Sequence, residues 1–433
     1  MRIDRLLANL TLTGGRRVLN EKALVRGYLC VHFGKTLLCR GASFLSLFVM
    51  IRYLDLPASL AGVIFLLGAL ANALADTAVG YIRSKMVATR PAMDHGILAL
   101  AAIAFAALPL FAPGTPDMVL AAIILFRIAF AWIDVPHNAL TSRIAATPDK
   151  ALPLSRARTL WSSAATLLIG AIAFPVMAQD ALSMADLAAL FVAIALIGWL
   201  FMLPLPGLFA RVATSGVPAL ASPGRRGRKY AWADRRLVGL VLTSSVVGVG
   251  LSALTKVLPH LDAGLYAWGA ASIMLINAGR LLVSACWGHI AAWFGASGLS
   301  ASLLLTAFFV AVLPWALAFQ PLALLCLVLI GCGTGGIGIV IWYAFTRTVQ
   351  ERAQPQDHAL AFGLFTTCIK LATGLGGMTA GLWIDAAGRD RLHVTTLTTG
   401  LVMISVSLVA VALLHMARSA LGNRLKQPIR APA

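Results

Sequence analysis

Residues 126–143 read FRIAFAWIDVPHNALTSR, and most of this stretch is apolar enough to lie in lipid. It also contains a helix breaker and four polar or ionisable side chains: Arg127, Asp134, Pro136, His137 and Asn138. On a helix, Arg127, Asp134 and Asn138 share one face because they are spaced by seven and four residues. A charge near the bilayer centre costs about 2.5–3.5 kcal/mol on insertion scales, so we expect this face to be turned away from lipid.

Pro136 removes a backbone hydrogen-bond donor and is expected to bend the helix. Such a bend is tolerated inside a membrane where side chains or water satisfy the freed carbonyl group. A bent helix with a polar face therefore predicts one wall of a water-filled cavity. The alternative is a buried Arg127–Asp134 ion pair that binds no ligand, with His137 as a simple hydrogen-bonding residue.

The whole chain has the composition of a membrane protein. Of its 433 residues, 60% are hydrophobic and only 12% are charged, whereas about a quarter of the residues in a soluble domain are charged. Twelve apolar stretches are long enough to cross a bilayer. They predict an all-α polytopic protein with spans at 27–53, 57–82, 94–112, 117–142, 157–178, 183–208, 237–260, 266–293, 297–319, 321–345, 359–386 and 394–417.

Lys and Arg are concentrated in alternate loops and in both tails, for example in the run GRRGRKYAWADRR at 224–236. This bias marks the cytosolic side of a membrane protein, so we expect both termini in the cytosol. It also explains the net charge of +19, since the chain shows no basic stripe interleaved with aromatic residues. We therefore expect an integral protein of a bacterial inner (plasma) membrane, with the lipid bilayer and no nucleic acid among its partners.

The longest predicted connection divides the chain into two groups of six spans, which is typical of the major facilitator fold. The expected organisation is a cytosolic tail at 1–23, a six-helix bundle at 24–208, a basic cytosolic linker at 209–236, a second six-helix bundle at 237–417 and a cytosolic tail at 418–433. We expect the protein to be a monomer.

Other predicted spans also carry polar side chains. Lys35 is expected to point inward, whereas Arg40, on another face of the same helix, is expected to pack between helices or extend to the interface. Asn72 and Asp76 are four residues apart and share a face. For Asp76 the alternative is a structural ion pair with Arg83.

The later spans contribute mainly cations and one large aromatic side chain: Arg158, Lys256, Asn277, Arg280, Trp342 and Lys370. Trp342 either stacks on a sugar or fills space. The cations of the spans, among them Lys35 and Arg127, outnumber the two intramembrane acids, Asp76 and Asp134. Surplus positive charge in a cavity favours an anionic ligand such as a carboxylate, phosphate or sulfate.

Five segments together resemble the glycoside–pentoside–hexuronide:cation symporter family, which includes melibiose permease and, in a wider group, the lysophospholipid transporters. They are HFGKTLL (32–38), ALADTAVGYIRSKMVATRP (73–91), WIDVPHNALTSRIA (132–145), LSRARTLWS (154–162) and FGLFTTCIKLATGLGG (362–377). The resemblance implies a cation- or proton-coupled transporter with a central cavity. It makes Asp134 and Arg158 substrate-binding residues, Lys35 and Lys370 cavity lysines, and Asp76 a cation-site acid.

The chain departs from this family where acids are expected. Thr36 and Asn72 replace two acids, and the segment FTRTVQERAQ (345–354) lacks the usual acidic stretch. Hard cations need clustered oxygen ligands, so a Na⁺ site is weakened and H⁺ coupling through Asp76 or Asp134, or no coupling, is favoured. Apart from a coupling H⁺ or Na⁺, we expect no cofactor and no metal, because the six cysteines show no CxxC or Cys/His spacing.

These features predict alternating-access transport of a small polar solute, anionic or sugar-like. The alternatives are a lysophospholipid or other amphiphilic anion carried by the same fold, and a membrane enzyme or non-transporting sensor. We expect no enzyme, because the loops contain no HExxH, DxxD or Ser–His–Asp pattern. The expected substrate-binding residues are Lys35, Asp134, Asn138, Arg158, Trp342 and Lys370, with Asp76 and Asn72 for coupling and Arg127, His137, Lys256 and Arg280 in secondary roles.

Overall fold

A computed structural model describes residues 21–424 except 86–90, 112–114, 146, 178–182, 215–234, 261–265, 295–296, 354–356 and 388–393. Most of the predicted N-terminal tail (1–23) and of the predicted linker (209–236), and the end of the predicted C-terminal tail (418–433), lie outside the described residues. The side of the membrane on which the termini lie, and the predicted domain bounds, stay predictions.

The described residues form twelve long helices and no strand, which confirms the all-α polytopic class. In chain order they are α2 (Glu21–Arg52), α3 (Ala58–Lys85), α4 (Pro91–Ala106), α5 (Pro116–Ile144), α6 (Pro148–Met177), α7 (Met184–Met202), α9 (Arg235–Val257), α10 (Tyr266–Phe294), α11 (Gly298–Ala316), α12 (Gln320–Arg352), α13 (His358–Ala386) and α14 (Val394–Arg424). A short helix α8 (Leu205–Thr214) and the 3₁₀ turns η1 (Leu108–Leu110) and η3 (Leu258–His260) complete the described elements.

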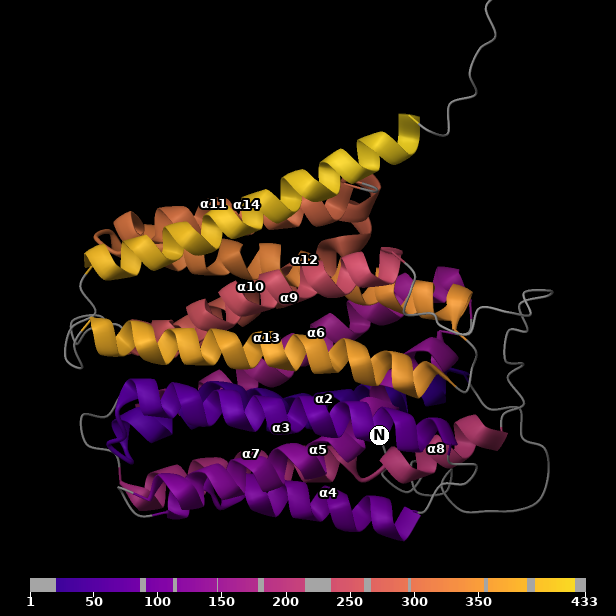
Figure 1. Ribbon diagram of the computed structural model, residues 1–433, viewed down its shortest axis with the longest axis horizontal. Helices are drawn as coiled ribbons and strands as arrows, with labels where there is room; N and C mark the ends of the chain where they lie inside the picture. Colours follow the sequence, from indigo (N-terminus) through magenta and orange to yellow (C-terminus); the bar gives the residue numbers. More distant parts are fainter. Residues whose placement is uncertain are drawn as a thin grey trace, which may run out of the picture.

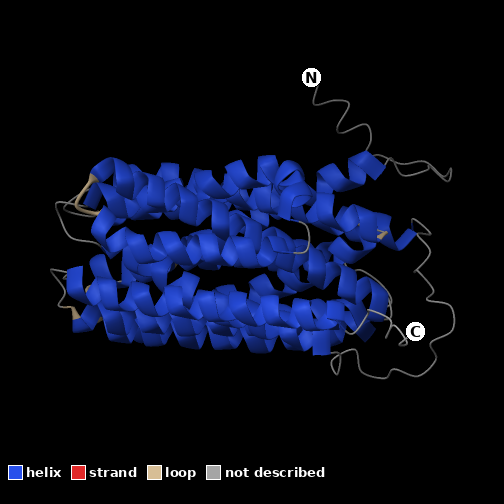
Figure 2. Cartoon of the chain, turned by 90° about the horizontal axis from the view of Figure 1, so that it is seen from above, coloured by secondary structure: helices blue, strands red, loops and turns tan. Residues whose placement is uncertain are grey.

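Ten of the described helices are long and apolar enough to cross a membrane, and α4 and α10 contain shorter apolar stretches. The helices lie roughly side by side, with the connections gathered at two ends of the bundle (Figures 1 and 2). We call the end at which α2 begins the near end, and the end at which α2 finishes with Arg52 the far end.

Two helix bounds differ from the predicted spans in ways that matter for the site. Helix α6 begins at Pro148 instead of residue 157, so Arg158 lies in its third turn rather than at its start. A proline fits the first turn of a helix because its missing N–H needs no partner there. The predicted span 183–208 ends earlier, since α7 stops at Met202 and α8 follows as a separate helix.

Helix α5 continues through Pro136 from Pro116 to Ile144. It packs against α3 and α4, and also touches α13. The closest partners between the first six and the last six long helices are α3 with α13 and α6 with α10 (Figure 1). These contacts bring α2, α3, α5 and α6 opposite α9, α10, α12 and α13 around the middle of the bundle.

Small residues allow α10 and α12 to approach closely. A β-carbon added at Gly331 would overlap the carbonyl oxygen of Ile276, and one added at Gly279 would overlap that of Val328. In lipid no hydrophobic effect drives two helices together, so the van der Waals contacts that small residues allow stabilise their association instead.

We therefore expect Gly331→Ala to lower the melting temperature of the detergent-solubilised protein, since overpacking costs about 1–3 kcal/mol. Gly96→Ala in α4 is the matched control, because a β-carbon there meets no atom within 4 Å. An unchanged melting temperature of Gly331→Ala would mean that α10 and α12 are not packed backbone to backbone.

Candidate functional site

A cavity of about 300 Å³ lies at the middle of the bundle. Its walls come from α2, α3, α5 and α6 on one side and from α9, α10, α12 and α13 on the other. Among the described residues that line it there is one carboxylate, Asp134, against six lysine and arginine side chains: Lys35, Arg40, Arg127, Arg158, Arg280 and Lys370. The cavity is therefore strongly cationic.

Asp134 of α5 joins both sides of the cavity. One of its carboxylate oxygens lies 2.8 Å from Nζ of Lys35 on α2, and the other lies 2.8 Å from Nζ of Lys370 on α13. Lys35 and Asp134 are almost fully buried. Low-dielectric surroundings strengthen such pairs, and removing one partner is costly because it leaves a buried charge uncompensated.

Asp76 lies behind Lys370 rather than on the cavity wall. Its carboxylate is fully buried and lies 2.7 Å from Nζ of Lys370, so Lys370 is shared between two acids on α3 and α5. The alternative pairing of Asp76 with Arg83 is wrong, because Arg83 pairs with Asp94 at 2.5 Å and lies over the ring of Trp132. Seven residues separate Asp76 from Arg83, which is about 10 Å along a helix and places them at different depths.

Arg158 of α6 is held by neutral groups. Its guanidinium donates to Thr141 Oγ1 at 2.8 Å, to Asn138 Oδ1 at 3.0 Å and to the hydroxyl of Tyr28. The ring of Trp342 lies against it, with 4.2 Å between the guanidinium carbon and the ring centre. Arg158 is buried and forms no ion pair with a described carboxylate.

Asn138 connects the arginine to the lysine–carboxylate pairs. Its Oδ1 accepts from Lys35 at 2.7 Å as well as from Arg158, and its Nδ2 donates to Asp134 at 2.9 Å. The face of α5 predicted from the seven- and four-residue spacing is thus present, and it does line a cavity.

Arg127 does not form the predicted alternative ion pair with Asp134. Two helical turns separate the two side chains, and Lys35 and Lys370 occupy the carboxylate instead. Arg127 lies 5.5 Å from the ring centre of Phe65 and lines the cavity without pairing with a described acid. Asn72 donates to the backbone carbonyl of Arg127 at 3.3 Å, so it supports α5 next to this charge.

The remaining predicted residues divide between the cavity and its surroundings. Trp342 lines the cavity, whereas His137 is not among the described lining residues. The ring of His137 stacks on that of Tyr28, and its Nε2 lies 3.2 Å from the backbone carbonyl oxygen of Tyr28. Arg40 was expected between helices or at the interface and instead lines the cavity. A membrane-embedded arginine reaches water most easily through an internal cavity when the bilayer surface is distant.

Tyr28 was not predicted from the sequence, although it contacts Arg158 and Thr141. It lies two helical turns before Lys35, so its position on the inward face of the first span was readable from spacing alone.

A second, smaller cavity of about 190 Å³ adjoins the first and shares Arg40 and Arg280 with it. Lys256 and Asn277, both nearly fully buried, line only this second cavity. We call it the side chamber. Among the described residues no group of three or more His, Cys, Asp or Glu side chains is arranged to hold a metal ion.

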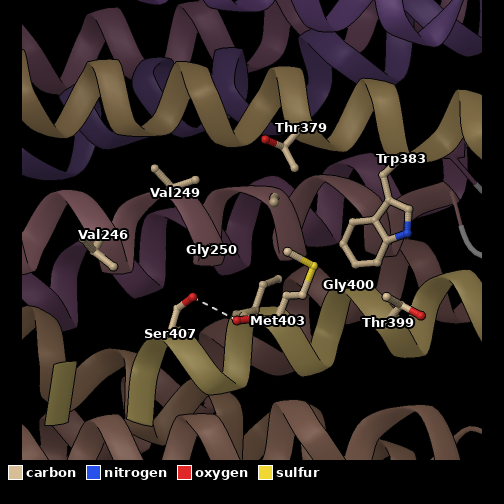
Figure 3. A pocket seen from close by; sticks show the side chains of 11 residues that line it. Val246, Val249, Gly250, Thr379, Trp383, Thr399, Gly400, Met403 and Ser407 are labelled. Carbon is tan, nitrogen blue, oxygen red and sulfur yellow. Dashed lines mark hydrogen bonds between the residues drawn. The ribbon is translucent and has the colours of Figure 1, made fainter. Parts of the chain in front are cut away.

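A larger pocket of about 750 Å³ lies between α9, α13 and α14 and has a different character (Figure 3). Its described lining is mostly apolar, with Val246, Trp383 and Met403, and contains no charged side chain. The hydroxyl of Ser407 donates to the carbonyl of Met403 in its own helix at 2.9 Å. None of the predicted site residues lines this pocket, so the cationic cavity is the candidate site.

Comparison with solved structures supports the same architecture. A bacterial homologue of the human drug peptide transporters PepT1 and PepT2 aligns with a TM-score of 0.67 at 13% identity, covering 94% of this chain and 100% of that one. The human organic anion transporter MFSD10 (TETRAN) gives 0.62 at 14% identity, covering 93% and 100%. The proton:xylose symporter XylE gives 0.62 at 14% identity, covering 92% and 95%. At these identities the likeness shows the fold alone.

No curated protein sequence matches the chain. A family described as MFS/sugar transport protein matches residues 28–422, which is nearly the whole chain and includes every residue of the cationic cavity. The family match and the transporter fold identify a transporter rather than an enzyme. The chain belongs to the MFS/sugar transport protein family, the melibiose-permease-like glycoside–pentoside–hexuronide group of the major facilitator superfamily.

Proposed function

We propose that this transporter moves a small anionic, sugar-like solute by alternating access, with a proton as the coupling ion. The observation that carries the proposal is the charge of the central cavity, whose described lining has six lysine and arginine side chains and one carboxylate. Buried charges without partners are costly, so a bound anion stabilises such a cavity more than a neutral sugar does.

The contacts of the cavity suggest how the solute is held. Arg158 has a planar guanidinium fixed by Asn138, Thr141 and the ring of Trp342, and this pre-organised fork suits a carboxylate. Asp134 retains acceptor capacity for a sugar hydroxyl group after its contacts with two lysines and Asn138, because a carboxylate has about four lone-pair sites. The family membership supports a sugar-like skeleton for the solute.

Contacts between the first and last six long helices are present at both ends of the bundle. At the near end Arg156 donates to the carbonyls of Ser284 and Ala285, and Ser142 is hydrogen-bonded to His358. At the far end a β-carbon at Gly62 would meet the backbone of Met378 at 3.1 Å. Alternating access requires one set of contacts to open while the other stays closed, with the solute bound between them.

Asp76 is the proton site of this proposal. A proton on Asp76 removes one of the two negative partners of Lys370 and so raises the positive charge beside the cavity. An anion in the cavity is then bound more tightly, and by linkage the bound anion favours the proton. This arrangement couples the entry of the proton to the entry of the anion without a metal ion.

The test is uptake of labelled galacturonate into proteoliposomes with and without an inward proton gradient. We expect the gradient to accelerate uptake by the unaltered protein and to have no effect on Asp76→Asn, which cannot be protonated. Asp186→Asn, at the exposed start of α7, is the control and should keep the gradient response. A full gradient response in Asp76→Asn would overturn the coupling role.

The same preparation tests the chemical class of the solute. We expect galacturonate to raise the melting temperature more than galactose or lysophosphatidylcholine does. Stabilisation by the lysolipid alone would favour the lysophospholipid alternative, and stabilisation by galactose alone would exclude an anionic solute.

A further inference from the structure

The side chamber is cationic and extends from the central cavity toward the far end. Along α2 the central cavity is lined from His32 onward, whereas the side chamber is lined only from Arg40 to Phe44, closer to the far end. Its other cations are Lys256, near the end of α9, and Arg280 of α10. No carboxylate occurs among the described residues that line it.

The donors of this chamber are largely unused. The side chains of Arg40 and Arg280 form no hydrogen bond or ion pair with any described residue, and Nε of Arg280 is buried without a partner. Nζ of Lys256 donates to Ser252 Oγ at 2.6 Å and lies 4.6 Å from the ring centre of Phe65. Three cations that line one small chamber, with no carboxylate among its described lining residues, repel one another. An anion between them would relieve both the repulsion and the unmet hydrogen bonds.

The two cavities share several lining residues, among them Arg40, Arg280 and Thr334, and Gly338 of α12 lines the central cavity next to Arg280. A β-carbon at this glycine would lie 3.9 Å from Nη2 of Arg280 and 4.0 Å from Oγ1 of Thr159, the residue next to Arg158. Both Arg158 and Arg280 line the central cavity, so both arginines face the space in which one solute would bind.

We propose that Arg40, Lys256 and Arg280 form a second anion subsite, and that the transported solute carries two separated anionic groups. The first group is the one assigned to Arg158, so this part of the inference rests on the proposed function. The second group occupies the side chamber and contacts Arg280 and Lys256. The existence of the subsite itself does not depend on the identity of the solute.

Inorganic sulfate tests the subsite directly. The Arg158→Gln variant lacks the arginine assigned to the solute's first anionic group. In this variant we expect sulfate to raise the melting temperature of the protein at constant ionic strength. Arg280→Gln added to that variant should abolish the effect, and Arg280→Lys should retain part of it. Arg347→Gln, which removes an exposed charge of α12, is the control and should leave the sulfate effect unchanged. An equal sulfate effect with and without Arg280 overturns the subsite.

A matched series of six-carbon compounds then tests the two-anion solute. Galactose carries no carboxylate, galacturonate carries one, and galactarate carries one at each end. We expect galactarate to bind at least about 10-fold more tightly than galacturonate, and Arg280→Gln to remove this preference, since one charge-assisted hydrogen bond contributes about that factor. Equal binding of the two acids refutes the two-anion solute.

The two experiments separate the possible failures. Absence of binding for all three compounds contradicts the sugar-like solute of the proposed function, whereas a sulfate effect that requires Arg280 still supports the subsite. A sulfate effect independent of Arg280 refutes the subsite even when galacturonate is transported.

Discussion

Replacing Arg158 with glutamine is expected to weaken galacturonate binding by about 30-fold or more while leaving the ligand-free protein no less stable. Truncating one partner of a buried charge pair costs about 2–5 kcal/mol of affinity. In the absence of ligand, however, Arg158 is a buried cation held only by neutral groups. Glutamine removes that uncompensated charge and retains donors for Asn138 and Thr141.

This opposite response of affinity and stability distinguishes a binding residue from a structural one. Binding is measured by isothermal titration and stability by the melting temperature without ligand. Arg347→Gln provides the control for loss of one positive charge at an exposed position. A large drop in ligand-free stability together with unchanged galacturonate affinity would show that Arg158 serves packing alone.

Replacing Asp134 with asparagine is expected to reduce both stability and transport, with transport falling about 100-fold or more. Asp134 is the described acid that contacts Lys35 and Lys370 together, so its loss releases a connection between α2, α5 and α13. Removing one partner from a buried ion pair costs about 3–5 kcal/mol because the remaining charge stays buried. The measurements are the melting temperature and initial uptake rate in proteoliposomes.

A compensating variant separates the two effects of Asp134. Lys35→Met combined with Asp134→Asn removes one charge of each sign and should recover most of the lost stability, but not transport. Full transport by the single Asp134→Asn variant would contradict the assignment of this carboxylate to the site. Recovery of transport by the double variant would show that Asp134 acts only by neutralising Lys35.

The sequence predicts the inward face of α5 well because that face follows from a local rule. Residues spaced by seven and four positions must share a side of a helix, and charged residues must avoid lipid. The same rule places Lys35, Arg158 and Lys370 in the interior, where the structure finds them in one cavity. The start of α6 was not predicted correctly by this reasoning, because residues 148–157 mix charged residues with two prolines and form no continuous apolar run.

The ion-pair partners of the buried acids could not be predicted from the sequence. Spacing suggested Arg127 as the partner of Asp134 and Arg83 as the partner of Asp76, because both lie on the same helix as the acid. The actual partner of Asp134 on α13 is 236 positions away, and Asp94 holds Arg83. Which cations meet an acid depends on which helices become neighbours and how each is rotated, and local periodicity contains neither quantity.

The sequence by itself determined that this chain crosses a membrane many times and carries more cations than acids in its spans, because the length, hydropathy and charges of each span are read from consecutive residues. Only the tertiary structure decided that Lys35 and Lys370 pair with Asp76 and Asp134, whereas Arg40, Arg158 and Arg280 line the cavities without pairing with a described acid. The physical reason is that ion pairing acts over a few ångströms, and helix packing sets those distances between residues far apart in sequence.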